Sequence, residues 1–70
     1  MKVLASEVVG QTKILCRDTE NGTPEPFATH IETWATGAVA GHYFQDPAEA
    51  MKDYALRVRG EKIRSALFTI

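Results

Sequence analysis

The chain has 70 residues, of which 44% are hydrophobic and 24% charged, and its formal net charge is −1 at pH 7. A chain of this length holds one small domain, and this hydrophobic content argues against disorder. The single cysteine excludes an internal disulfide and a Cys-x-x-Cys zinc site, and no stretch approaches the length of an apolar membrane span. We therefore expect one domain over residues 1–70, without a cofactor or membrane, and self-association as support for its modest core.

The single thiol suggests the compartment in which the protein is found. Cys16 lies in the apolar run Ile14–Cys16, so we expect a buried thiol rather than a reactive one. With no signal-peptide pattern at the start, this predicts a reducing, cytoplasmic location.

Charge is distributed unevenly along the chain. Residues 1–50 carry seven acidic and three basic side chains, whereas residues 51–70 carry five basic and two acidic ones. The C-terminal segment is therefore a basic strip on a slightly acidic body.

The first part of the chain predicts a β-hairpin followed by a loop. Residues Lys2–Val9 and Thr12–Thr19 are strand-like and flank a plausible tight turn at Gly10-Gln11, although Leu4–Val9 is also compatible with a short helix. The segment Asp18–Pro26 contains Asn-Gly and two prolines, which do not fit a central strand. We expect this segment to be a solvated loop.

A second hairpin is predicted from Phe27–Trp34 and Ala38–Phe44. A three-residue loop, Ala35–Gly37, needs a positive φ only at Gly37 and is therefore favoured. In this register Trp34 opposes Ala38, Ile31 opposes Gly41, and His30 opposes His42. Strand alternation then separates a core face from a mixed face. The core face has Phe27, Thr29, Ile31, Thr33, Val39 and Tyr43, and the mixed face has Ala28, His30, Glu32, Trp34, Ala38, Ala40, His42 and Phe44.

A helix is expected to begin directly after this hairpin. Asp46 is a good N-cap, Pro47 suits the first helical position, and Glu49 lies where it can complete a capping box. The helix should run to about Arg59, with Gly60 as its C-terminal cap. Its apolar stripe comprises Met51, Tyr54, Ala55 and Val58. Residues 61–70 fit either a short helix or tail on the sheet, or a terminal strand over Ala66–Ile70.

These elements predict an α+β fold: a small antiparallel sheet of three to four strands, built from two hairpins, with one helix packed on one face.

The two histidines are the sharpest candidates for a chemical site. In the predicted register His30 and His42 approach closely enough to share a metal ion, and Glu32 would add a carboxylate on the same face. Without a further ligand fixed by spacing, the pair is better interpreted as packing or titrating near neutral pH. We therefore expect no metal. Because no pattern provides a nucleophile with an oxyanion hole, we also expect no enzyme.

The mixed face of the second hairpin predicts a protein interface. Its apolar members form a patch that either the terminal segment Ile63–Ile70 or another chain must cover: Trp34, Ala38, Ala40 and Phe44. This favours a small intracellular protein-binding module that forms a homodimer. The alternative is a nucleic-acid-associated regulator whose basic residues hold phosphate beside stacking aromatic rings, although the acidic sheet region opposes it. Those basic residues are Arg57, Arg59, Lys62 and Arg64.

The run Gly-His-Tyr-Phe-Gln-Asp-Pro-Ala-Glu-Ala-Met-Lys-Asp-Tyr, within residues 37–58, resembles small bacterial and phage β-β-α domains. In these domains an aromatic strand precedes an acidic helix start, and the HicB-type antitoxin with its partial RNase H-like domain is the nearest named case. The resemblance implies an antitoxin-like regulator. This chain departs from the family in its glycine and proline pattern before the helix and in having no separate DNA-binding tail.

Overall fold

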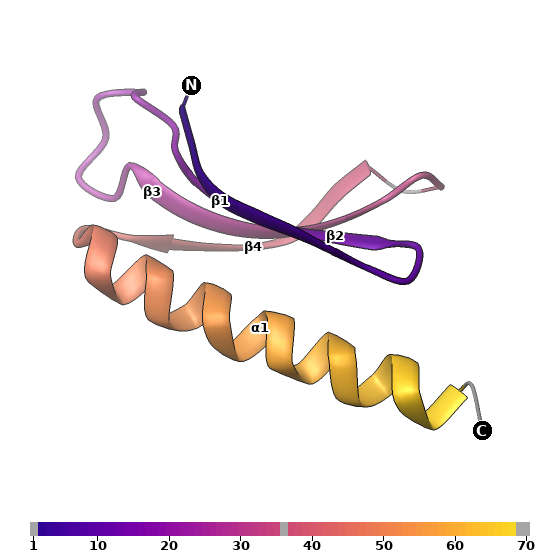
Figure 1. The fold of residues 1–70 in the computed structure, drawn as a ribbon. Coiled ribbons are helices and arrows are strands. Elements are labelled where there is room, and N and C mark those ends of the chain that lie inside the picture. Colours follow the sequence, from indigo (N-terminus) through magenta and orange to yellow (C-terminus); the bar gives the residue numbers. More distant parts are fainter. Residues whose placement is uncertain (1, 36, 69–70) are drawn as a thin grey trace.

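A computed structural model of the protein describes residues 2–35 and 37–68, and these form four strands and one helix. The strands are β1 (Lys2–Val9), β2 (Thr12–Asp18), β3 (Phe27–Thr33) and β4 (Gly37–Phe44), and the helix is α1 (Pro47–Phe68). The strands pair in chain order, each antiparallel to the next, and α1 packs along one face of the sheet (Figure 1). The predicted α+β fold is therefore confirmed.

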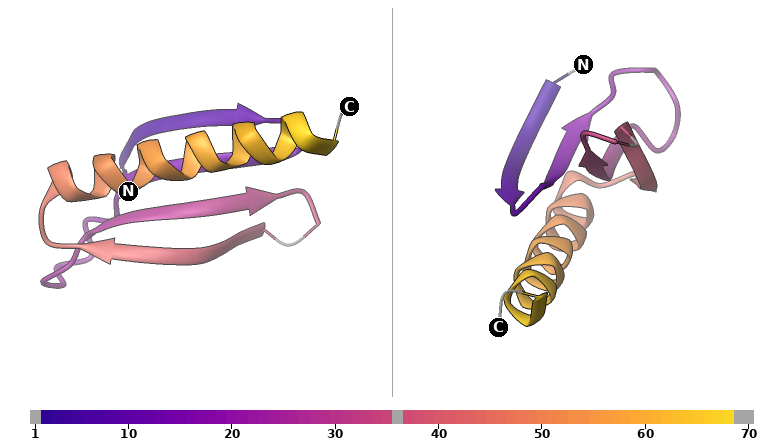
Figure 2. Two further views of the ribbon diagram at one scale, coloured as in Figure 1. Left: turned by 90° about the horizontal axis from the view of Figure 1, so that it is seen from below. Right: turned by 90° about the vertical axis from the view of Figure 1, so that its right-hand side faces the viewer.

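The molecule is long and thin, with principal extents of 44 × 24 × 16 Å. One helix on one sheet gives two layers, and α1 lies mainly under β1 and β2 while the outer part of the β3–β4 hairpin extends beside it (Figure 2). Ile14 and Cys16 of β2 meet Ala50 and Val58 of α1 in the buried core. The buried state predicted for Cys16 is confirmed, and its thiol is free.

The first hairpin has the predicted turn at Gly10, whose φ of 62° suits glycine. Val9 pairs with Thr12 and Glu7 pairs with Ile14, so the alternative of a helix over Leu4–Val9 is wrong. The loop that follows β2 is closed by the amide of Thr19, which donates to the carbonyl of Pro26 at 2.8 Å.

The register predicted for the second hairpin is wrong. Thr33 pairs with Gly37, Glu32 with Ala38, and Ile31 with Val39, so Trp34 lies in the turn rather than opposite Ala38. Gly37 has the expected positive φ of 68°, while Thr36 lies outside the described residues.

A bulge in β4 changes the register of this hairpin a second time, further from the turn. Between the pairs Ile31–Val39 and Thr29–His42, β4 has two residues, Ala40 and Gly41, whereas β3 has only His30. Ala40 within the bulge has a φ of 55°. Beyond the bulge His42 opposes Thr29 instead of His30. The predicted faces of Tyr43 and Phe44 are consequently exchanged: Phe44 lies on the helix-covered face and Tyr43 on the opposite one.

The helix begins as predicted but does not end as predicted. The carboxylate of Asp46 accepts a hydrogen bond from the amide of Ala48 at 2.8 Å, which is an N-cap. The predicted end at Arg59 is wrong, because α1 continues through Gly60 to Phe68. A single glycine costs a helix only about 1 kcal/mol, and Lys62 beyond it forms an ion pair with Glu7 of β1 at 2.9 Å. The helical state also excludes a strand starting at Ala66, while residues 69 and 70 lie outside the described residues.

Candidate functional site

A polar cluster joins α1 to the middle of the sheet, with the carboxylate of Asp53 at its centre. The hydroxyl of Thr29 donates to Asp53 Oδ2 at 2.5 Å, and His42 Nδ1 lies 3.0 Å from the same oxygen. Arg57, one helical turn further along α1, places its Nε 3.3 Å away. One carboxylate oxygen thus connects β3, β4 and two positions of the helix.

Local structure explains how distant residues converge on Asp53. The cap at Asp46 sets the rotation of α1, so that Asp53 and Arg57 face the sheet together. The bulge in β4 turns His42 onto the helix-covered face, next to Thr29. Without that extra residue, His42 would point to the other side of the sheet.

The electrostatics of the cluster favour an ionised Asp53 and a neutral Cys16. Burial alone would raise the pKa of Asp53, but hydrogen bonds from Thr29 and His42 and the charge of Arg57 outweigh it and lower that pKa. Burial, reinforced by the charge of Asp53, raises the pKa of the Cys16 thiol. Cys16 is therefore protonated at neutral pH and is a poor nucleophile.

The chemistry open to this cluster is limited. Because an ionised carboxylate only accepts hydrogen bonds, His42 donates to Asp53 from Nδ1, and its side chain is half exposed. This contact orients the imidazole ring, but the thiol of Cys16 is buried and protonated. We therefore interpret the cluster as a tie between the helix and the sheet.

His30 is separated from His42 by the thickness of the sheet. His30 is only 6% exposed, and its ring meets the ring of Tyr43 edge-on, with 5.9 Å between their centroids. Burial, followed by the nearby charges of Arg17 and Arg57, lowers the pKa of His30 despite the opposing effect of Glu32. His30 is thus neutral at physiological pH.

The structure does not bring together the three residues considered for a metal. Glu32 shares the face of His30, but His42 lies on the other face with Asp53. Within residues 2–35 and 37–68, no group of three or more His, Cys, Asp or Glu side chains could hold a metal ion.

The four residues predicted as an interface do not share one surface. Trp34 is 85% exposed in the turn, and Ala38 pairs with Glu32 on the face opposite the helix. Ala40 is the strained residue of the bulge, and Phe44 pairs with Phe27 on the helix-covered face. Trp34 alone among them is a large, freely exposed apolar group.

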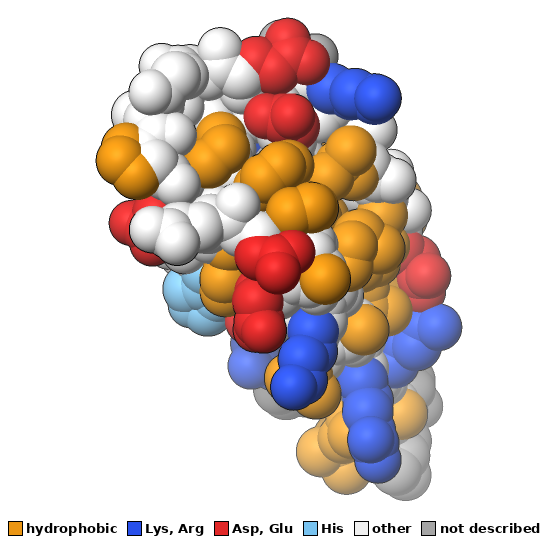
Figure 3. Space-filling view, turned by 90° about the vertical axis from the view of Figure 1, so that its left-hand side faces the viewer, with side chains coloured by type: hydrophobic (Ala, Val, Ile, Leu, Met, Phe, Trp, Pro, Cys, Tyr) orange, Lys and Arg blue, Asp and Glu red, His pale blue; other side chains and the backbone are white. Residues whose placement is uncertain are grey.

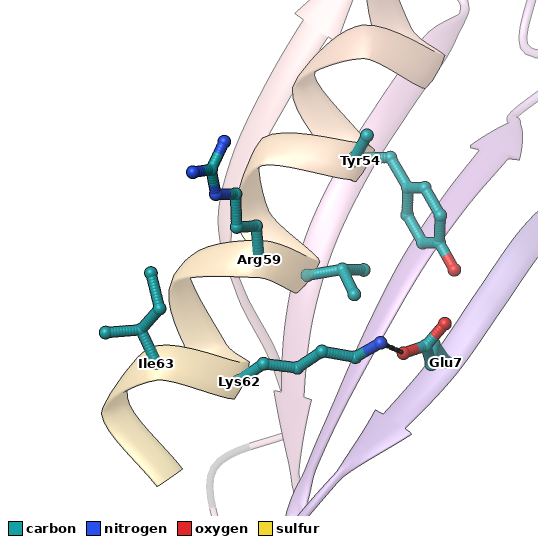
Figure 4. A pocket seen from close by; sticks show the side chains of 7 residues that line it. Glu7, Tyr54, Arg59, Lys62 and Ile63 are labelled. Carbon is teal, nitrogen blue, oxygen red and sulfur yellow. Dashed lines mark ion pairs between the residues drawn. The ribbon is translucent and has the colours of Figure 1, made fainter. Parts of the chain in front are cut away.

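The basic residues of the nucleic-acid alternative are also dispersed. Arg57 is nearly buried against Asp53, Lys62 pairs with Glu7, and Arg64 pairs with Glu61 at 3.6 Å. Arg59 is exposed and lines a groove of about 620 Å³ between α1 and β1. In Figure 4, Lys62 reaches across that groove to Glu7, whereas Arg59 and Ile63 point away from β1. Three of the four cations therefore already have an acidic neighbour.

A surface that sequence reasoning missed lies on the outer side of α1. Leu56, Ile63 and Leu67 are 61%, 55% and 67% exposed. Figure 3 shows hydrophobic side chains on the sheet end of the molecule and again toward the far end of the helix, among Lys and Arg. The spacing of these residues was visible in the sequence, but the expected cap at Gly60 placed Leu56 in a different element from the other two.

Comparisons of this chain with protein-family models, curated proteins and solved structures find no match. In the described part of the chain, no helix combines the length and apolar character needed to cross a membrane. Function must therefore be argued from the geometry of this molecule.

Proposed function

We propose that the protein is a small, non-enzymatic module that binds protein and associates with a second copy of itself. The supporting observation is an imbalance of apolar side chains in the described part of the chain. Five hydrophobic residues are buried there, two of them alanines, whereas ten large hydrophobic side chains are exposed. Since apolar burial is the main favourable term in folding and association, this chain keeps much of that surface available for a partner.

The thinness of the molecule supports self-association in particular. A chain of 70 residues with two layers buries a small core, and small domains commonly gain stability by oligomerising. The free, buried thiol of Cys16 supports a cytoplasmic location, where thiols remain reduced.

Sedimentation velocity tests this proposal. The mass of the wild-type protein should rise from monomer to dimer between about 1 µM and about 1 mM, the range in which a modest apolar interface saturates. A protein that stays monomeric over that whole range contradicts the self-association.

The alternative, a nucleic-acid-associated or antitoxin-like regulator, stays a prediction with its own test. Binding to RNA or DNA at low salt should weaken steeply as salt is added, and replacing Arg59 and Lys62 with Glu should weaken it further. The existing ion pairs of Lys62 and Arg64 count against this alternative.

A further inference from the structure

We propose that the second copy docks on the outer side of α1, with the two helices antiparallel. The docking surface is the outer seam, formed by Leu56, Gly60, Ile63 and Leu67. This inference rests on the proposed self-association and assigns it a surface and an orientation.

The outer seam points away from the sheet. At 3.6 residues per turn, Leu56, Ile63 and Leu67 lie within about 40° of one another around the helix. They lie on the side opposite Ala50 and Val58, which are buried in the core, and each is more than half exposed. The seam spans three helical turns, so it is a stripe rather than a single exposed residue.

Gly60 has no role in the structure of the single chain that would require glycine. It has no positive φ, and a Cβ built on it would meet nothing within 4 Å. Glycine is nevertheless an unfavourable residue inside a helix. A glycine at the centre of an exposed apolar stripe is explained when another helix packs closely against it.

The spacing of the seam fits a second copy of this helix in the antiparallel direction. Its residues are separated by four, three and four positions, a pattern that is the same in both directions. In an antiparallel pair, Leu56 of one copy therefore faces Leu67 of the second, and Ile63 of each copy fits over Gly60 of the other. Both copies use the same patch, as a two-fold symmetric interface requires. A parallel pair would instead set Gly60 against Gly60 and leave a gap.

Cysteine cross-linking tests the orientation. Leu56→Cys and Leu67→Cys are made as separate variants, mixed, and oxidised. In the antiparallel pair the mixture forms a disulfide dimer containing one copy of each variant. Neither variant alone should cross-link, because positions 56 and 67 are about 16 Å apart along the helix, far beyond the reach of a disulfide. The wild type, with its buried Cys16, is the control.

Charge substitutions test the surface. Leu56→Glu and Ile63→Glu should each raise the dissociation constant at least about tenfold, while circular dichroism shows an unchanged fold because both positions are exposed. Trp34→Glu and Val8→Glu are matched controls at other exposed apolar positions, and they should leave the dimer intact.

The outcomes separate this inference from the proposed function. If the wild type dimerises but the seam variants dimerise equally well, or Trp34→Glu yields monomers, the seam is overturned while self-association holds. If each single-cysteine variant cross-links with itself, the antiparallel orientation is overturned. A wild type that never dimerises overturns both.

Discussion

Ala40 and Gly41, neighbours in β4, are an alanine where the backbone favours glycine and a glycine where the packing leaves no room for a side chain. Ala40 adopts a φ of 55°, which glycine tolerates better than alanine. Gly41 has no positive φ, but a Cβ placed on it would lie only 2.9 Å from Nε2 of His30. The glycine therefore serves the close approach of His30, and alanine bears the strained conformation.

Gly41→Ala should destabilise the protein by about 1–3 kcal/mol, the usual cost of forcing atoms into a packed site. His30 is buried against Tyr43 and has little room to move. Urea denaturation, followed by far-UV circular dichroism, would measure the loss.

Ala40→Gly is the matched control for that substitution. It should be neutral or stabilising by up to about 1 kcal/mol, because it relieves the positive φ without adding an atom. A Gly41→Ala variant as stable as the wild type would contradict the close packing of His30.

At the level of the elements, the sequence predicts where α1 starts far better than where it ends. The cap at Asp46 is a local signal and acts as expected. Gly60 followed by polar residues also resembles a local stop signal, but the helix passes through it. The contacts of the segment beyond Gly60, such as the pair between Lys62 and Glu7, join residues far apart in the chain and carry no local pattern.

The difference between local signals and long-range contacts also explains why the register predicted for the second hairpin is wrong. The positive φ at Gly37 follows from residue type, and it was predicted. The bulge at Ala40 does not follow from residue type, because alanine is an ordinary strand residue. A one-residue change in pairing reverses every face beyond it, so the convergence of His42 and Thr29 on Asp53 was hidden from the sequence.

Asp53→Asn should lower the free energy of unfolding by about 2–3 kcal/mol, since it removes a charged hydrogen-bond acceptor and leaves Arg57 nearly buried without its counter-charge. Chemical denaturation at neutral pH would measure this loss. Glu7→Gln is the control, because its ion pair with Lys62 is exposed to solvent and should matter much less. Equal losses in the two variants would refute the role of Asp53 as the tie between helix and sheet.

At the level of the whole molecule, the fold class was predictable because alternation and turn residues define two hairpins and a capped helix. The exposed surface was not, because it depends on how α1 lies across the sheet. The helix buries Ile14 and Cys16 with one side, and the opposite side, the outer seam, is exposed in the described part of the chain. Ile63 and Leu67, which belong to the segment expected to pack on the sheet, are therefore on the surface.

The buried His30 makes the stability of the whole protein depend on pH. Burial and the nearby arginines hold its pKa below the ordinary value in the folded state, so as pH falls the unfolded chain takes up a proton before the folded one does. Stability should thus be level between about pH 7.5 and pH 8 and fall as pH drops through the unfolded pKa of about 6.5, with a slope of at most about 1.4 kcal/mol per pH unit. The lowered pKa of Asp53 affects stability only below about pH 5, outside this window. His30→Gln, compared with the wild type by urea denaturation at about pH 7.5 and pH 5.5, should remove most of this loss. An equal loss in both proteins would show that the proton binds elsewhere.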